Sequence, residues 1–237
     1  MRLMLTVAAV ALLTACSPSQ PKADPEFGAK VRAYLLEHPE LLVEMSEKLE
    51  VKQAEASRQK ALAGIGANRD KLERDPRDHV LNPDGKITVV QFFDYNCGYC
   101  KLIAPQVLTM AKENPDVRFV FKDLVIFGEA SEYSAAGASL AKTSEQYKAI
   151  HNAFMSTKPL NDEAVDRILK ANGVDPAEAR KAQSDAKRKA YIKDVHTLAE
   201  TLGIQGTPAF IIGDVLIPGA DGAALKAAVA NAKKKAS

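Results

Sequence analysis

Cys97 and Cys100 are separated by two residues in the stretch DYNCGYCK, residues 94–101. Two cysteines at this spacing can form a redox pair or supply half of a zinc site. The apolar run 87–93 predicts a buried strand before them, and residues 101–112 predict a helix after them. At the start of a helix, unpaired backbone N–H groups and the helix dipole stabilise a thiolate. We therefore predict that Cys97 attacks disulfides and that Cys100, one turn further along, attacks the mixed disulfide to release the substrate.

A zinc site is the first alternative to a redox pair. Zinc in proteins has about four ligands. The histidines are scattered without metal-ligand spacing, and the sequence contains no second CxxC; they are His38, His79, His151 and His196. The sequence therefore favours the redox pair, and each histidine is interpreted as a packing or surface residue. Because a pair of thiolates suits Cu(I), a copper-handling or client-holding protein stays open as a second alternative.

The composition is that of a globular protein, with 46% hydrophobic and 26% charged residues. The formal net charge of +2 argues against a nucleic-acid-binding protein, since such domains carry a clear basic excess. The chain holds 3 cysteines, too few for a scaffold stapled by disulfides. If the dithiol is itself the redox centre, no cofactor and no metal are predicted.

The first fifteen residues have the features of an export signal. Arg2 gives a positive start, and the apolar run 3–13 is too short to span a bilayer. The stretch LTAC, residues 13–16, resembles the lipobox of bacterial lipoproteins, in which the chain is cut before a cysteine that becomes lipidated. The resemblance implies lipidation of Cys16, and Ser17 implies anchoring at the outer membrane. An ordinary signal peptide, cut elsewhere, is the alternative. We expect a bacterial periplasmic protein, in a compartment where disulfides persist.

Four segments are predicted along the chain. They are a lipoprotein signal peptide (1–15), a tether (16–25), a helical self-association segment (26–75) and an α/β domain (76–237).

The helical segment is predicted to form one helix over 26–37 and another from residue 40 to about 74. Unbroken, the second helix would be about 50 Å long. Its apolar stripe is confined to the first part of the helix, with little to pack against in its own chain. This pattern favours a homo-oligomer held together by residues 26–75. The alternative is a helix that lies across the main domain.

The α/β domain is predicted to have the order β–β–α–β, a helical insert over about 129–203, and β–β–α. The strands 79–81 and 87–93 flank Asn82-Pro83-Asp84-Gly85 and so predict a hairpin. The other strands are predicted at 117–121, 209–212 and 215–217. A closing helix is predicted over 221–235, with Asp221 as its N-cap. The insert is predicted to break near Pro159, Gly173 and Pro176.

Two stretches together resemble a known family. VVQFFDYNCGYCK and, far downstream, GIQGTPAFIIG are similar to the thioredoxin fold, and more closely to the exported DsbA-like proteins. The resemblance covers about residues 78–235. It implies an α/β thioredoxin fold with an inserted helical domain, and thiol–disulfide exchange with exported proteins that contain cysteines. It also implies a membrane redox partner, and a cis bond between Thr207 and Pro208 that faces the CxxC and positions the substrate backbone.

A second resemblance concerns the choice between oxidase and isomerase. VRAYLLEHPELLVEMSEKLE resembles the leader of the ScsC-like branch, whose members associate through it and include disulfide isomerases. Gly98 and Tyr99 between the cysteines, and Thr207 before the proline, are also the residues that DsbC-type isomerases carry at these positions. Strongly oxidising DsbA proteins carry Pro-His between the cysteines and Val before the proline. The resemblance therefore implies isomerase or reductase chemistry, with Gly98 and Tyr99 tuning the thiolate. A DsbA-like oxidase is the alternative.

One position departs from the thioredoxin-like pattern. These proteins bury an acid six residues before the first cysteine, where it serves proton transfer at the second. This chain has Gln91 there, and an amide cannot accept a proton at neutral pH. Asp94, Lys101 or water is therefore expected to assist Cys100.

Overall fold

The chain divides into two compact units, residues 1–51 and 52–237, of which the computed structural model describes residues 24–236. The predicted signal peptide, the lipidation site Cys16 and most of the tether lie outside the described residues. None of the helices within 24–236 combines the length and apolar character of a membrane span.

The smaller unit is helical where it is described. It contains α1 (Pro25–Glu37) and the first part of α2 (Glu40–Ala67), close to the predicted bounds. Asp24 caps α1 by accepting the N–H of Glu26 at 3.0 Å. Within residues 24–51 most large apolar side chains of both helices are exposed, and Leu35 and Leu41 are half-buried. The exposed ones include Phe27, Tyr34, Leu36, Leu42, Val43, Met45 and Leu49. This unit therefore carries an apolar surface that nothing in its own described residues covers.

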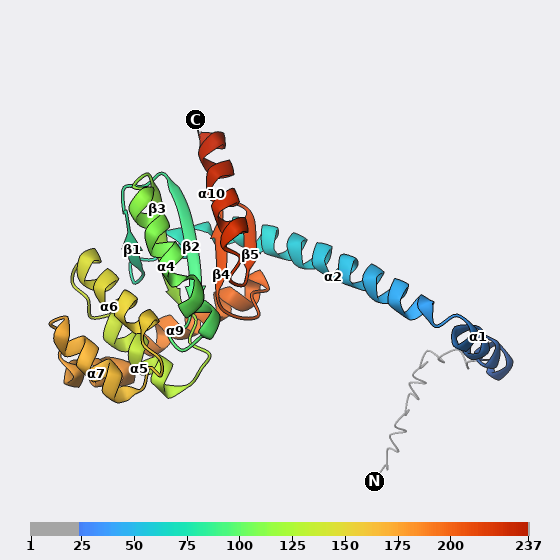
Figure 1. Cartoon of the computed structure of the whole chain (residues 1–237), viewed down its shortest axis with the longest axis horizontal. Coiled ribbons are helices and arrows are strands. Elements are labelled where there is room, and N and C mark those ends of the chain that lie inside the picture. Colours follow the sequence, from blue (N-terminus) through green and yellow to red (C-terminus); the bar gives the residue numbers. More distant parts are fainter. Residues whose placement is uncertain (1–23, 237) are drawn as a thin grey trace, which may run out of the picture. The chain divides into compact units, whose positions relative to one another are not determined.

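A mixed five-stranded sheet lies at the centre of the larger unit (Figure 1). The strands are β1 (His79–Leu81), β2 (Ile87–Phe93), β3 (Val117–Asp123), β4 (Ala209–Ile212) and β5 (Val215–Pro218). Their order across the sheet is β1–β3–β2–β4–β5, with β2 and β3 parallel and the other neighbours antiparallel. The order of elements along the chain is the predicted one, and the fold is the thioredoxin fold that the resemblance implied.

The predicted hairpin between β1 and β2 is wrong, because β1 pairs with β3. The turn instead carries the chain across the start of β3. There Asn82 donates its side-chain amide to the carbonyl of Val117 at 3.0 Å. A Cβ on Gly85 would lie 2.4 Å from the nitrogen of Arg118, so glycine is required at this crossing.

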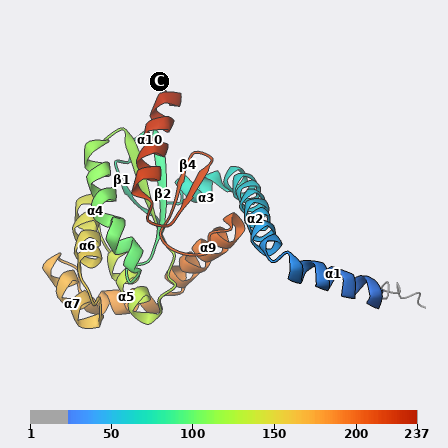
Figure 2. The same cartoon turned by 45° about the vertical axis from the view of Figure 1, so that its right-hand side comes forward.

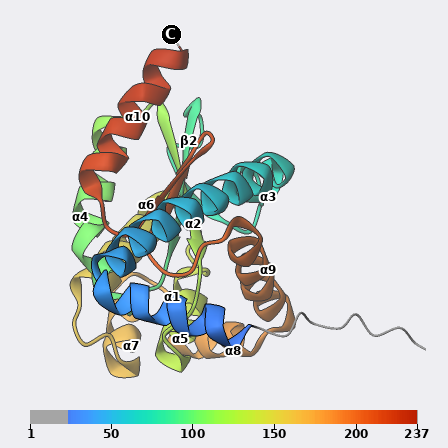
Figure 3. The same ribbon diagram turned by 90° about the vertical axis from the view of Figure 1, so that its right-hand side faces the viewer.

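Helices cover both faces of the sheet and gather beyond one end of it. They are α3 (Arg69–Glu73), α4 (Gly98–Glu113), α5 (Glu129–Ala138), α6 (Ser144–Ser156), α7 (Asp162–Ala171), α8 (Pro176–Ser184), α9 (Ala186–Leu202) and α10 (Gly222–Ala236). Figure 3 shows α4 and α10 on one side of the sheet, with α3 and α9 on the other. The inserted helices α5, α6 and α7 lie together near the start of α4 (Figure 2).

The insert breaks at more places than the sequence predicted. Besides the breaks before α7 and α8, the chain leaves the helix before α6 and again at Asp185. Thr143 caps α6 by accepting the N–H of Gln146, and Asp185 caps α9 by accepting those of Lys187 and Arg188. Asp221 caps α10 as predicted, accepting the N–H of Ala224 at 2.8 Å.

The end of α2 and all of α3 belong to the packing of the larger unit. Ile65 and Leu72 are buried in a cluster with Leu202 on the α9 side of the sheet. A Cβ on Gly64 would lie 3.0 Å from a methyl carbon of Leu202, so this glycine permits close packing of α2 on α9. The predicted single helix from residue 40 to about 74 is interrupted only at Asn68, and the end of the predicted self-association segment docks on its own domain.

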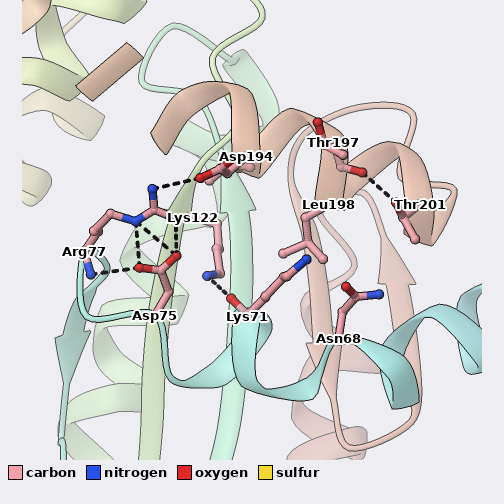
Figure 4. A pocket seen from close by; sticks show the side chains of 10 residues that line it. Asn68, Lys71, Asp75, Arg77, Lys122, Asp194, Thr197, Leu198 and Thr201 are labelled. Carbon is pink, nitrogen blue, oxygen red and sulfur yellow. Dashed lines mark hydrogen bonds and ion pairs between the residues drawn. The ribbon is translucent and has the colours of Figure 1, made fainter. Parts of the chain in front are cut away.

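A buried ion pair holds the segment that follows α3. Asp78 and Lys122 are 2.5 Å apart, and both side chains are 1% exposed. Lys122 also donates to the carbonyl of Lys71, while Tyr191 donates to Asp78. A cavity of about 210 Å³ adjoins this ion pair. At its edge Arg77 lies between the carboxylates of Asp75 and Asp194 (Figure 4). These contacts anchor the segment to β3 and α9.

We expect Asp78→Ala to lower the free energy of unfolding of the reduced protein by about 3–5 kcal/mol, because it leaves the Lys122 charge buried without its partner. Denaturant titration measures this change. Asp194→Ala is the matched control: Asp194 pairs with Arg77 at 2.8 Å at the surface, and we expect a loss of about 1 kcal/mol or less. Equal effects of the two variants would contradict the anchoring role of Asp78.

Candidate functional site

Cys97 is the residue on which α4 begins. β2 ends at Phe93, and a short turn follows in which the N–H of Cys97 bonds to the carbonyl of Asp94 at 3.2 Å. The Cys97 sulfur then occupies the N-cap position of α4 and accepts the N–H of Cys100 at 3.4 Å. The predicted strand, cysteine pair and helix are thus placed as the sequence indicated. Both cysteines are free thiols and both are buried.

The surroundings of Cys97 favour its thiolate. A hydrogen bond from the Cys100 side chain is the main cause that lowers the pKa of Cys97, to about 5, and it outweighs the opposing effect of burial. Thr207 and the N–H groups of Cys100 and Tyr99 lower the pKa further. Cys97 is therefore charged at neutral pH, and the thiolate is the form that attacks a disulfide.

Cys100 has the opposite electrostatic environment. Burial, and then the neighbouring Cys97, raise the pKa of Cys100 far above its ordinary value. Next along the chain, Lys101 donates to the carbonyls of Phe154 and Thr157 at 2.8 and 2.7 Å, which ties the start of α4 to the end of α6. Burial lowers the pKa of Lys101 to about 8, although Asp94 and both cysteines favour its charge. The two cysteines are thus unequal: one is a thiolate, and the other holds its proton.

Thr207 and Pro208 lie against the cysteines. The peptide bond between them is cis, as the resemblance implied. The Cys97 thiol is 3.2 Å from the carbonyl oxygen of Thr207, to which it can donate until it ionises. The Thr207 hydroxyl is buried and has no hydrogen-bond partner among the described residues. The structure therefore brings together the residues that the sequence placed 110 positions apart.

Gln91 is buried on the α4 side of the sheet. It is 1% exposed, and neither polar atom of its side chain has a hydrogen-bond partner within residues 24–236. It precedes Phe93 by two positions on β2, so both side chains point to the same face as Cys100. An amide therefore replaces the acid in the apolar layer behind the second cysteine.

Asp94 organises the turn before Cys97. Its side chain is buried and accepts the N–H of Asn96 at 2.7 Å and the hydroxyl of Ser131 at 2.6 Å. Its other oxygen accepts the N–H groups of Ile126 and Phe127 at 2.7 and 3.1 Å. This carboxylate was expected only as an aid to Cys100, but in the structure it binds a loop.

Exposed apolar side chains lie on the elements next to this turn, and most of them were not predicted from the sequence. Tyr99 and Leu102 on α4 are 68% and 71% exposed, and Ile126 and Phe127 after β3 are 44% and 53% exposed. The available signal was an apolar pair, Ile126-Phe127, that lies directly before Gly128 and shortly after β3 ends at Asp123. Within residues 24–236, no group of three or more His, Cys, Asp or Glu side chains could hold a metal ion.

Comparison with known proteins gives the family. Residues 88–228 match the family described as "DSBA-like thioredoxin domain". The chain belongs to the DSBA-like thioredoxin family. Residues 25–56 of this DSBA-like chain also match the "Copper resistance protein ScsC N-terminal domain". The resemblances to DsbA-like and ScsC-like proteins are thereby confirmed.

Solved structures of similar proteins cover most of this DSBA-like chain. It is 29% identical to Salmonella enterica Typhimurium BcfH, with a TM-score of 0.73 over 88% of this chain and 95% of that one. It is 29% identical to Proteus mirabilis ScsC in a transitional conformation, with a TM-score of 0.67 over 89% and 96%. It is 37% identical to a thioredoxin-like oxidoreductase from Silicibacter pomeroyi, with a TM-score of 0.65 over 70% and 98%.

Curated relatives share a shorter region. The thiol:disulfide interchange protein DsbA of Bordetella pertussis is 26% identical over 140 residues, which are 54% of this chain and 64% of that protein. Matches to chloroplastic thioredoxin-like proteins of Oryza sativa and Arabidopsis thaliana span 17% and 26% of those proteins. The DSBA-like chain thus spans less than two thirds of the length of these curated relatives.

The Cys97 environment predicts a pH-dependent stability of the reduced protein. Its pKa falls from an ordinary 9.0 to about 5 in the folded state, so folding is favoured where the unfolded thiol would still hold its proton. This contribution is full near pH 9, declines as the pH falls, and is lost below about pH 5. We expect the melting temperature of the reduced form, relative to the oxidised form, to rise from pH 5 to pH 9. Above pH 9, ionisation of Cys100 in the unfolded chain opposes the trend.

Absorbance of the thiolate at 240 nm measures the same group directly. We expect one step with a midpoint near pH 5, absent in Cys97→Ala and retained in Cys100→Ala at a higher midpoint, because the Cys100 thiol no longer donates to Cys97. A midpoint above pH 8 in the wild type would contradict the stabilisation described here.

Proposed function

We propose that this protein is an envelope thiol–disulfide oxidoreductase that acts on exported proteins and leans toward disulfide isomerase or reductase chemistry. The observation that carries the proposal is the Cys97 sulfur, which caps α4 at 3.4 Å from the N–H of Cys100 and lies 3.2 Å from the Thr207 carbonyl. The family match and the names of relatives support it, since these include thiol:disulfide interchange and thiol–disulfide exchange proteins.

In the proposed reaction the Cys97 thiolate attacks one sulfur of a client disulfide. A bond forms between Cys97 and that sulfur, the client S–S bond breaks, and the other client sulfur leaves as a thiolate. Cys100 then loses its proton and attacks the Cys97 sulfur, so the client is released with two thiols and the Cys97–Cys100 disulfide forms. In isomerisation the freed client thiolate instead attacks a different client disulfide and displaces another client sulfur as a thiolate. That thiolate attacks the client sulfur bonded to Cys97, so a new client disulfide forms and Cys97 leaves as a thiolate. The dithiol carries the electrons, so no cofactor takes part.

Proton transfer at Cys100 is assigned to its surroundings. As Cys100 attacks the Cys97 sulfur, its proton passes to the client sulfur that leaves, so the client departs as a thiol. Lys101 favours the thiolate form of both cysteines through its charge, an interaction that appears in the pKa of Lys101 itself. The side-chain amide of Gln91 accepts no proton in this step.

Thr207 and Pro208 are proposed to position the client backbone. The N–H of Thr207 has no partner among the described residues, while its carbonyl faces Cys97. An extended client segment could bond to this N–H with its cysteine beside Cys97. Gly98 and Tyr99 are proposed to tune the thiolate, which is supported by the Tyr99 N–H that lowers the pKa of Cys97.

The isomerase leaning rests on Gly98, Tyr99, Thr207 and self-association. The match to the ScsC amino-terminal domain over 25–56 and the exposed apolar residues of 25–51 support a homo-oligomer. Because Ile65 and Leu72 pack within the larger unit, we place the association surface upstream of residue 61. A DsbA-like oxidase remains the alternative within the same chemistry.

Location and partners complete the proposal. A periplasmic thioredoxin-like protein from Salmonella enterica, 32% identical with a TM-score of 0.63, supports a periplasmic site of action. We propose anchoring at the outer membrane through a lipid on Cys16, and a membrane redox partner that resets the dithiol.

We expect Cys97→Ala to abolish reshuffling of a scrambled disulfide substrate, because no thiolate remains to attack. Cys100→Ala is the matched control: it keeps the attack but cannot resolve the adduct by forming the Cys97–Cys100 disulfide. It should accumulate a covalent adduct, visible by non-reducing electrophoresis. Retained activity in Cys97→Ala would contradict the proposal. Negligible turnover by the wild type, together with tight stoichiometric binding of Cu(I), would favour the copper-handling alternative instead.

We expect deletion of residues 26–51 to reduce the solution mass to that of a monomer. It should lower the isomerase activity more than it lowers the rate at which the protein reduces a small disulfide. This deletion keeps Ile65 and Leu72 in the core. Met45→Lys with Leu49→Lys should have the same effect, whereas Glu47→Lys with Glu50→Lys, on the same helix, should not. Light scattering gives the mass, and a monomeric wild type would contradict self-association.

A further inference from the structure

The loop that follows β3 is pinned along its backbone while its largest side chains face solvent. The N–H of Leu124 bonds to the carbonyl of Phe93 at 2.9 Å, and His196 bonds to the carbonyl of Val125 at 2.8 Å. The N–H groups of Ile126 and Phe127 both bond to Asp94. Four consecutive residues are thus held by the fold, and the side chains of the last two remain about half exposed.

Asp94 joins this loop to the cysteine turn. One oxygen accepts Asn96, the neighbour of Cys97, and the other accepts the loop. With Ser131 the carboxylate receives four hydrogen bonds, which fills its capacity as an acceptor. Asp94 is 2% exposed, so these bonds replace the water that a carboxylate would otherwise bind. The loop therefore cannot move relative to Cys97 without leaving a buried charge short of donors.

We propose that Asp94 is a positioning residue that fixes Ile126 and Phe127 as one wall of the client-binding surface beside Cys97. The clients that fit this wall present an apolar or aromatic side chain next to the cysteine under attack, as incompletely folded chains do. This inference rests on the proposed function and deepens it by naming the chemistry of the client segment. A pinned wall binds such a side chain with less loss of conformational entropy than a mobile loop would.

Asp94→Asn is the decisive variant because it keeps the shape of the side chain. An amide has one acceptor oxygen, and its NH₂ group must face donors on one side of the site. We expect KM for a disulfide peptide with a phenylalanine next to its cysteine to rise about tenfold, since hydrogen bonds to a charged group contribute on that order. Loss of support for the cysteine turn would lower the rate with glutathione disulfide, which has no apolar side chain to reach the wall, as much as the rate with the peptide. We therefore expect the loss with the phenylalanine peptide to exceed the loss with glutathione disulfide about tenfold.

Phe127→Ala tests the wall itself and should raise the same KM. Asp94→Asn should add little to it in the double variant, because both changes remove one binding element. Asp175→Asn and Val215→Ala are matched controls: Asp175 also accepts a backbone N–H, that of Ala177, and Val215 is an exposed apolar residue on β5. Neither control should change KM. Additive effects of Asp94→Asn and Phe127→Ala, or an unchanged KM in either, would overturn the inference.

A measurement on the wild type covers the case in which Asp94→Asn does not fold. Amide hydrogen exchange of Ile126 and Phe127 should be slow, because both N–H groups are bonded to a buried carboxylate. Exchange as fast as in an unstructured peptide would overturn the pinning. If the wild type turns over no disulfide at all, the proposed function fails; if it does so while the variants bind clients normally, only the role of Asp94 fails.

Discussion

The hydrogen bond from the Cys100 amide to the Cys97 sulfur makes the nucleophile part of a helix. Because the sulfur serves as the N-cap of α4, the position of the reactive atom is fixed by the same geometry that starts the helix. Everything else in the site is arranged around that atom: Thr207 lies across from it, and Asp94 holds the turn before it. The apolar core behind α4 then keeps Cys100 neutral. The helix end thus fixes the position of Cys97, while the Cys100 side chain on the first turn of the same helix is the main cause of its acidity.

Elements whose signals are local were predicted from the sequence, and pairings between distant elements were not. The strand before Cys97, the helix after it and the Asp221 cap each depend on a few adjacent residues. The hairpin between β1 and β2 was wrong because a turn sequence reports that the chain reverses, but not which strand it then meets. Here Gly85 and Asn82 bring the chain across β3 instead. The extra helix breaks were marked by Thr143 and Asp185, whose capping character outweighs the helical tendency of their neighbours.

The candidate site was predictable in its chemistry but not in its surroundings. A CxxC between a strand and a helix identifies the dithiol, and the distant Thr-Pro was placed only through resemblance to a family. The carboxylate of Asp94 could not be assigned, since its partners are N–H groups on a loop 32 and 33 residues away. Spacing in sequence holds no information about such a contact. The same holds for Ile126 and Phe127, whose exposure contradicts their residue types.

Residues 52–56 and 58–60 of α2 are all exposed, although Ala61 and Ile65 further along the same helix are buried. Because this stretch contributes no buried side chain, the segment before it can be replaced, lengthened or lost without exposing the core of the thioredoxin-like unit. Natural selection can therefore vary the leader, and with it any assembly that the leader mediates, independently of the dithiol.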